Sequence, residues 1–147
     1  MTSLPSHRLH KSASNGASVV LADGAVLDCG GTNQYVAAIS GAGTVANGTL
    51  TAGALVADAE APGCLTVEGT FAVPSGMTVE LRNLPEITGT TYVNMLRADS
   101  FAGAENLVSA VFVGEAVPSD VKAKLVLRDG CLAVRFSKIR GSILVVR

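Results

Sequence analysis

The segment ISGAGTVANGTLT, residues 39–51, carries the strongest fold signal in this chain. It contains two turn signals, Ser40-Gly41 and Asn47-Gly48, seven residues apart. Glycine adopts the positive φ angles that tight turns require, and asparagine tolerates them better than most residues. The residues beside these turns are mainly β-branched or apolar, which favours strands. The segment therefore predicts short strands joined by glycine turns.

Similar pairs of turn signals stand on both sides of this segment. Asn15-Gly16 and Asp23-Gly24 precede it, and Glu68-Gly69 and Ser75-Gly76 follow it. The three pairs begin at residues 15, 40 and 68, so they recur after 25 and then 28 residues. Recurrence at such a period is typical of stacked coils and predicts a short parallel β-solenoid. The alternative is a β-sandwich, in which Asn47-Gly48 and Ser75-Gly76 would form tight antiparallel hairpins.

The last part of the chain has a different pattern. Two alternating segments, Lys122–Arg128 and Cys131–Phe136, flank the dipeptide Asp129-Gly130. Asp-Gly between alternating strands is among the strongest hairpin signals, because a type I′ turn needs positive φ at both central residues. Ser142–Val146 follows as a predicted last strand. We expect these strands to form an antiparallel cap, since an open last coil exposes unpaired backbone groups.

These patterns divide the chain into a tail and one all-β domain. Residues 1–14 are predicted to be a disordered tail or an expression remnant, and residues 15–147 to be the domain. Within it we expect solenoid coils over 15–97, a connecting segment over 98–121 and the antiparallel cap over 122–147. Ser100–Ala110 is the best candidate for a short helix, although Gly103 weakens it.

Composition excludes several classes of function. Charged residues make up 16% of the chain and its net charge is −1, which argues against a nucleic-acid partner. Such weak charge gives little repulsion between copies, so self-association is plausible. No apolar run is long enough for a transmembrane helix. The basic residues near the start are not followed by an apolar region, so we expect no signal peptide in this chain.

Three segments together resemble a known family. Residues 39–51, residues 65–79 (LTVEGTFAVPSGMTV) and residues 91–98 (TYVNMLRA) are similar to the glycine-turn pattern of autotransporter-associated β-strand repeats. The resemblance implies the C-terminal portion of a right-handed parallel β-helix, from the passenger of a secreted or surface-anchored bacterial protein. Such passengers are mostly stalks or adhesins, and the family supplies no catalytic motif to transfer to this chain.

Few residues suggest chemistry. His7 and His10 lie three residues apart, but no acidic residue or cysteine stands near them, so we interpret them as part of the tail. Asp58 and Glu60 are the sharpest enzymatic candidates, because carboxylates on one strand face could cleave polysaccharides. Their segment also contains Pro62 and Gly63, which favours a polar loop. We therefore predict no catalytic residues and no metal site.

Two further patterns have structural explanations. Gly41-Ala42-Gly43 begins like a dinucleotide-binding motif, but Ala46 replaces the third glycine and a strand follows, so we predict no cofactor. Cysteines occur at three widely spaced positions, which fit neither a disulfide framework nor a metal site. We interpret them as small buried apolar residues, and a disulfide between the first two remains open. They are Cys29, Cys64 and Cys131.

The sequence therefore favours a structural or interaction module without catalytic activity, located outside the cell or on its surface. Its partner would be a surface glycan or protein, or a second copy that pairs through the apolar edge strand Ile143–Val146. The alternative is a carbohydrate-binding or polysaccharide-active module. Tyr35 and Tyr92 are the aromatic candidates for sugar contact, and two residues make a small platform.

Overall fold

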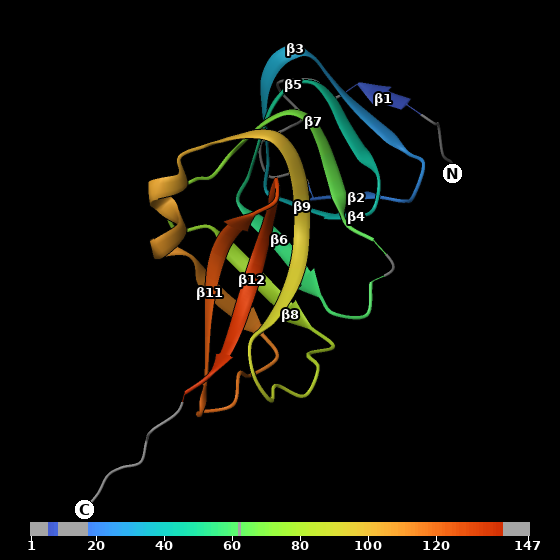
Figure 1. The fold of residues 1–147 in the computed structure, drawn as a ribbon. Helices are drawn as coiled ribbons and strands as arrows, with labels where there is room; N and C mark the ends of the chain where they lie inside the picture. The colour runs from blue at the N-terminus through green and yellow to red at the C-terminus, as the bar shows by residue number, and fades with distance from the viewer. Residues whose placement is uncertain (1–5, 9–17, 62, 140–147) are drawn as a thin grey trace, which may run out of the picture.

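The computed structural model describes residues 6–8, 18–61 and 63–139, and for residues 6–8 only the backbone. Apart from one short helix, the regular elements of these residues are β-strands, so the predicted all-β class is confirmed. The strands form two sheets (Figure 1). The seven strands of the first, sheet A, are, in spatial order, β1 (Ser6–Arg8), β3 (Val26–Val36), β5 (Thr44–Ala52), β7 (Leu65–Ala72), β9 (Thr91–Ala102), β12 (Cys131–Lys138) and β11 (Val121–Arg128). The five strands of the second, sheet B, are, in spatial order, β10 (Val111–Gly114), β8 (Thr78–Arg82), β6 (Ala54–Asp58), β4 (Ala38–Gly41) and β2 (Ser18–Leu21).

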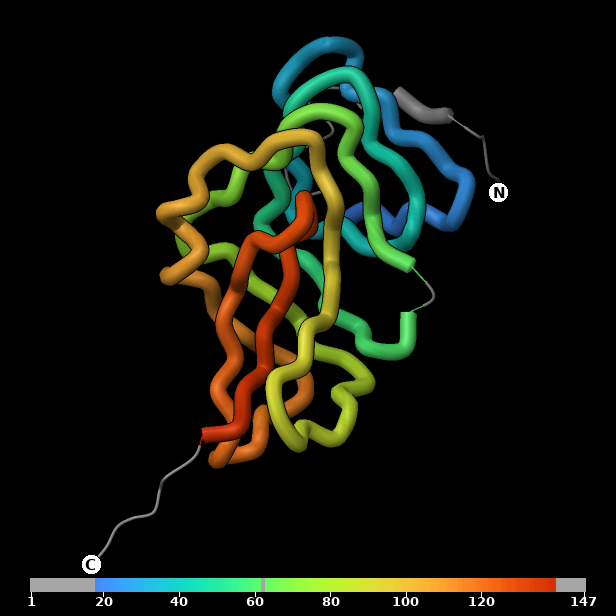
Figure 2. The backbone as a smooth tube through the Cα atoms, in the orientation of Figure 1, coloured from blue at the N-terminus to red at the C-terminus, as the bar shows by residue number. Residues whose placement is uncertain are grey.

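The chain alternates between the two sheets from β1 to β10. Each new strand is laid parallel to the strand that the chain placed in the same sheet one passage earlier. Figure 2 shows the backbone passing repeatedly from one sheet to the other. Sheet B is parallel throughout, whereas sheet A becomes mixed where β12 and β11 pair antiparallel beside β9.

Columns of apolar side chains fill the space between the sheets. In sheet A one column contains Leu27, Val45 and Val67, which occupy matching positions in β3, β5 and β7 and are at most 1% exposed. In sheet B, Ile39 pairs with Leu55 in the same way. These columns explain the alternation of buried and partly exposed positions along the strands, because side chains on a strand point alternately to its two faces.

The predicted turn pairs do not align structurally equivalent positions, because the second signal of one pair matches the first signal of the next pair. Asn47-Gly48 and Glu68-Gly69 lie inside β5 and β7, and Gly48 and Gly69 are register partners. The register shifts beside them, so these glycines form bulges that bend the strands. Ser75-Gly76 instead connects β7 of sheet A to β8 of sheet B. None of these sites joins two antiparallel strands, contrary to what the sandwich alternative requires.

The spacing between equivalent residues also differs from the predicted 25 and 28 residues. In sheet A the column runs from Leu27 to Val45, then Val67, then Ala98, which gives intervals of 18, 22 and 31 residues. The intervals lengthen because the connections after β6 and after β8 grow, as residues 59–64 and 83–90 join sheet B back to sheet A. The predicted fixed period therefore does not describe the spacing of equivalent residues in successive strands.

The C-terminal hairpin is confirmed. β11 and β12 pair antiparallel over their whole length, and Asp129 (φ 53°) and Gly130 (φ 77°) form the turn. The predicted connecting segment, 98–121, is partly wrong, because β9 extends to Ala102 and β10 joins the edge of sheet B. Of the helix predicted over residues 100–110, only η1, a 3₁₀ helix over Ala104–Ser109, is present.

The ends of the chain correct one prediction and leave another outside the described residues. Residues 6–8 form β1, which pairs with β3, so this part of the predicted disordered tail is a strand of sheet A. The predicted last strand, Ser142–Val146, lies outside the described residues.

Candidate functional site

Two adjoining pockets flank the connection between β6 and β7, and each has a volume of about 360 Å³. The first is bordered by the C-terminal ends of β2, β4 and β6 and by Arg82. The second lies beside the start of β9 and is lined by Thr91, Tyr92 and Val93. Some residues at the end of β6, in the connection and on β9 line both pockets. These shared residues are Asp58, Ala61, Gly63, Cys64 and Asn94.

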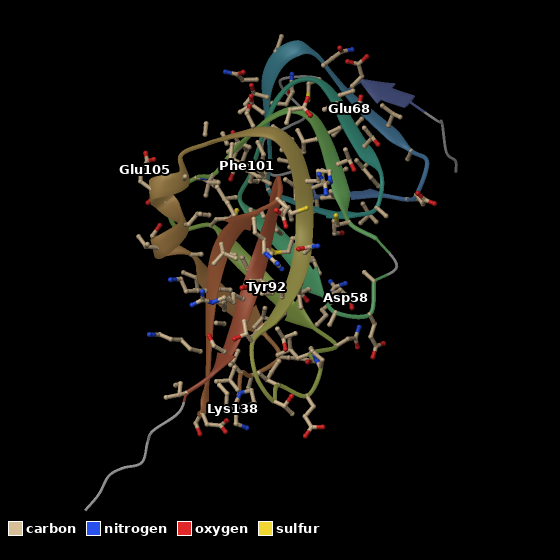
Figure 3. The ribbon with its side chains drawn as sticks, in the orientation of Figure 1. Asp58, Glu68, Tyr92, Phe101, Glu105 and Lys138 are labelled. Atoms are coloured by element: carbon tan, nitrogen blue, oxygen red, sulfur yellow. The ribbon has the colours of Figure 1, made fainter. Side chains whose placement is uncertain are left out.

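The second pocket exists because β9 is longer than its neighbour β7. Pairing between them begins at Leu65 and Leu96, so residues 91–95 extend past the start of β7. The connection from β6 lies beside this part of β9 instead of a paired strand. Figure 3 shows Asp58 where this connection begins and Tyr92 further into the sheet.

Asp58 holds the two connections at this end together. Its Oδ1 accepts a hydrogen bond from the Glu60 amide at 2.9 Å and another from Asn83 Nδ2 at 2.9 Å. The bond from Asn83 and then that from Glu60 lower the pKa of Asp58 below its usual value of 3.8, with Arg82 adding to the effect. Asp58 is thus kept ionised, and its carboxylate accepts hydrogen bonds from N–H groups in both connections.

The paired-carboxylate hypothesis does not fit this geometry. Asp58 is the last residue of β6, and Glu60 lies in the turn beyond it, so the two are not on one face of a strand. Another acidic residue nearby is also used by the backbone. The Glu115 carboxylate accepts from the amides of Asn83 (3.1 Å) and Leu84 (2.9 Å). The Asp58 and Glu115 carboxylates therefore hold the neighbouring loops in place.

The glycine motif between β4 and β5 is used by the neighbouring strand. The amides of Ala42 and Gly43 both donate to the carbonyl oxygen of Leu21, at 2.8 and 3.1 Å. A Cβ on Gly43 would lie 2.7 Å from the Ala25 oxygen, so the glycine permits close backbone approach. These two amides are therefore engaged by the backbone of β2.

The three cysteines are free thiols. Cys29 and Cys131 are buried, as predicted, whereas Cys64 is only half-buried at the pockets. Burial is the main cause that raises the pKa of Cys29, and Asp28 adds to it. Burial also raises the pKa of Cys64, assisted by Cys131 and opposed by Arg97. A raised pKa lowers the thiolate fraction, so neither group is activated as a nucleophile.

The two tyrosines do not form a shared platform. Tyr92, at the start of β9, is 38% exposed. The guanidinium carbon of Arg128 lies 3.7 Å from the centroid of its ring. Tyr35 is 40% exposed on β3, at the level of Ala102 on β9. Ala102 is ten residues beyond Tyr92, or roughly 33 Å along the strand. Of the two tyrosines, Tyr92 lines the second of these pockets and Tyr35 lines neither.

Other predicted features concern metals, membranes and the histidines. In the described ranges, no group of three or more His, Cys, Asp or Glu side chains could hold a metal ion. None of the described helices is long and apolar enough to cross a membrane. The backbone of His7 belongs to β1, whereas His10 lies outside the described residues.

Sequence reasoning missed the residues that give this end of the molecule its shape. Asn83 and Glu115 follow β8 and β10, which pair within sheet B, whereas Asn94 lies on β9 of sheet A and lines a pocket with Asp58. The one available signal was Asn83 just after an alternating strand, since asparagine tolerates the positive φ (52°) that it adopts there. Comparisons of the chain with family models, curated proteins and solved structures found no significant match.

Proposed function

We propose that the chain is a structural or interaction module, built as a short right-handed parallel β-helix that β11 and β12 cap. One observation carries the proposal: residues at matching positions stack through successive parallel strands in both sheets. Ile39, Leu55, Val79 and Phe112 form such a column in sheet B. Each passage through the two sheets is then one coil, and coils that share backbone hydrogen bonds form a stiff body about 4.8 Å longer per coil.

The residues that could carry chemistry support a structural role. Asp58 and Glu115 accept hydrogen bonds from turn amides, and the glycine motif serves the packing of adjacent coils. Cys29, which is buried and has a raised pKa, is suited to packing. The sequence resemblance to autotransporter-associated repeats motivates the remainder of the proposal, that the module is a stalk-like or adhesin-like part of a secreted or surface-exposed bacterial protein.

The coil arrangement and the location can be tested separately. Cross-strand nuclear Overhauser effects between Val45 and Val67 and between Leu55 and Val79 are expected for parallel coils. Antibodies raised against the chain should label intact cells of the source organism. Labelling that requires cell lysis would contradict the surface location, and antiparallel cross-strand contacts would contradict the β-helix.

A second candidate function is carbohydrate binding at the pocket beside β9. Its support is the exposed Tyr92 ring next to Asp58 and Asn94, because sugars stack on aromatic rings and bond to carboxylate and amide groups. Titration with a panel of bacterial cell-surface polysaccharides should then show binding that Tyr92→Ala abolishes. Tyr35→Ala is the matched control, since Tyr35 is equally exposed but lines neither pocket. Equal binding by both variants would exclude this site.

A further inference from the structure

The outer face of sheet A is basic where β12 and β11 continue the sheet beyond β9 (Figure 1). Leu125, Val134 and Val93 are register partners that face the core, so the residues on either side of them point outward. Five outward positions of these strands hold a cationic residue, and together they define the basic face. They are Arg97 on β9, Lys122, Lys124 and Arg128 on β11, and Arg135 on β12.

The positive charge of the basic face is not balanced by neighbouring acidic residues. Among the described residues, ion pairs form at Arg82 and at Lys138, which are not part of this face. Neither β11 nor β12 contains an acidic residue. On β9 the first acidic residue is Asp99, two positions beyond Arg97. The face therefore carries a surplus of positive charge, although the whole chain has a net charge of −1.

Two of these cations stand directly opposite each other. Lys124 of β11 and Arg135 of β12 are cross-strand partners. Such partners have Cβ atoms about 5 Å apart, and like charges at this distance destabilise a sheet. In addition, the Nε atom of Arg135 is buried and has no hydrogen-bond partner, which costs further free energy. An anionic group bound between Lys124 and Arg135 would relieve both costs.

Tyr92 positions another cation on the same face. It is the cross-strand partner of Arg135, and the guanidinium group of Arg128 packs against its ring. Since β12 lies between β11 and β9, Arg128 reaches across β12 to make this contact. Along β11, the Cα atoms of Lys122 and Arg128 are six residues apart, or about 20 Å. One small anion does not span this distance, so the basic face suits a polymer with several negative charges.

The chemistry of the face distinguishes between kinds of polyanion. Single-stranded nucleic acids stack their bases on aromatic rings, but Arg128 already packs against the ring of Tyr92. Membrane surfaces are bound with the help of exposed apolar side chains, whereas the outward residues Val126 and Ala133 are half-buried and buried. An acidic polysaccharide requires neither feature. Its carboxylates are distributed along the chain, and its hydroxyl groups bond to exposed polar side chains such as Asn94.

We propose that the basic face binds a linear acidic polysaccharide, whose carboxylates contact Lys124, Arg135 and Arg128. A carboxylate between the first two accepts a hydrogen bond from each and removes their repulsion. The second pocket continues this surface, because Tyr92 and Asn94 also line it. The inference rests on the proposed interaction module and names the chemical class of its partner.

Two charge-reversal variants test the proposal. Lys124→Glu and Lys138→Glu change the net charge equally, but Lys138 lies outside the basic face and pairs with Asp120. Lys124→Glu places unlike charges opposite each other at Arg135, so it should fold at least as stably as the wild type. We expect it to weaken the binding of polygalacturonate roughly tenfold at low salt, and Lys138→Glu to change the affinity less than about twofold. Isothermal titration calorimetry measures the affinities, and urea denaturation measures the stabilities.

The ligand control is polygalacturonate with methyl-esterified carboxyl groups, which keeps the sugar chain, loses its charge and should not bind. Absence of binding by the wild type, or equal losses in the two variants, would overturn the proposal. Tighter binding of poly-uridylate or of phosphatidylserine vesicles at the same salt concentration would also overturn it, in favour of a nucleic acid or a membrane. A chain that does not bind polygalacturonate but shows the parallel cross-strand contacts would lose this partner and keep the β-helix. Failure of this inference is thereby distinguished from failure of the proposed function.

Discussion

Gly48 of β5 lies close to the backbone of β3. Its φ angle is 151°, and a Cβ at this position would collide with the carbonyl oxygen of Thr32. Gly69 repeats the arrangement one strand further, where a Cβ would collide with the Gly48 oxygen. Gly76 also has a positive φ, 71°, but open space surrounds the position of its missing Cβ. Glycine is thus required at Gly48 for both conformation and packing, and at Gly76 for conformation alone.

Gly48→Ala should therefore destabilise the fold more than Gly76→Ala. We expect a loss of roughly 2–4 kcal/mol in the free energy of unfolding for the first, and about 1 kcal/mol for the second. Urea denaturation followed by far-ultraviolet circular dichroism measures both. Equal losses would show that the backbones of β3 and β5 are not in close contact at this position.

The pKa of Asp58 gives a second test at the scale of single residues. Asn83→Ala removes the hydrogen bond that contributes most to lowering this pKa, so the pKa should rise toward 3.8. A lowered carboxyl pKa stabilises the fold above the unfolded pKa, and that stabilisation is lost as pH falls through the folded value. In the variant, the pH-dependent part of the stability below about pH 4 should shrink. Carbon-13 titration of the carboxyl group measures the shift.

Asn94→Ala is the matched control for this experiment. Asn94 lines the same pockets as Asp58, but it is not among the groups that lower the Asp58 pKa. Its removal should leave the titration unchanged. An Asp58 pKa that moves as much in the control as in Asn83→Ala would contradict the assigned hydrogen bond.

At the scale of elements, the strand β12 covers one side of the core. Phe136 and Val134 are 0% exposed, and β12 lies between β9 and β11. Phe136→Ala should cost about 3–5 kcal/mol of unfolding free energy, because the cavity lies in a closely packed interior. Leu127→Ala on β11, where the side chain is 39% exposed, should cost less than about 1 kcal/mol. Similar costs for both would mean that the hairpin does not cover the core.

The elements that sequence predicted best were those with a purely local cause. The turn at Asp129-Gly130 depends on two adjacent residues that adopt positive φ, so it was predicted correctly. Asn47-Gly48 carries a similar local signal, but it bends a strand within sheet A. Both dipeptides adopt positive φ angles, and only the neighbouring strand decides whether a turn or a bulge forms. The strand β10 was missed because Val111–Gly114 is short and gains its partner from β8, thirty-three residues away.

The candidate site was less predictable than the fold. Asp58 was selected from the sequence as an acid, yet its partner Asn83 is 25 residues away, and their contact depends on the pairing of β6 with β8. The second pocket arises from a difference in length between β7 and β9, and neither strand shows this difference by itself. Register between distant strands decides such features, and a single sequence does not contain it.

At the scale of the whole molecule, the two ends are joined through one sheet and one core. Sheet A runs without a break from β3 to β12, and a single cluster of buried residues extends from Leu21 to Phe136. In stacked-coil proteins each coil contacts only its neighbours, so an end coil can open separately when its interface is weak. The columns of fully buried residues in this chain favour unfolding as one unit.

Two buried thiols at opposite ends report on this cooperativity. Cys29 in β3 is 1% exposed and Cys131 in β12 is 6% exposed, whereas Cys64 can be removed as Cys64→Ser to leave only these two. Labelling with a thiol reagent across a urea gradient, followed by mass spectrometry of each peptide, gives a midpoint for each cysteine. We expect the midpoints to coincide with each other and with the loss of circular dichroism, because Cys29 belongs to the core cluster and Cys131 is buried in β12, whose Leu132, Val134 and Phe136 belong to the same cluster. A lower midpoint for Cys29 would show that the first strands unfold before the hairpin, and the molecule would then behave as a stack of separate units.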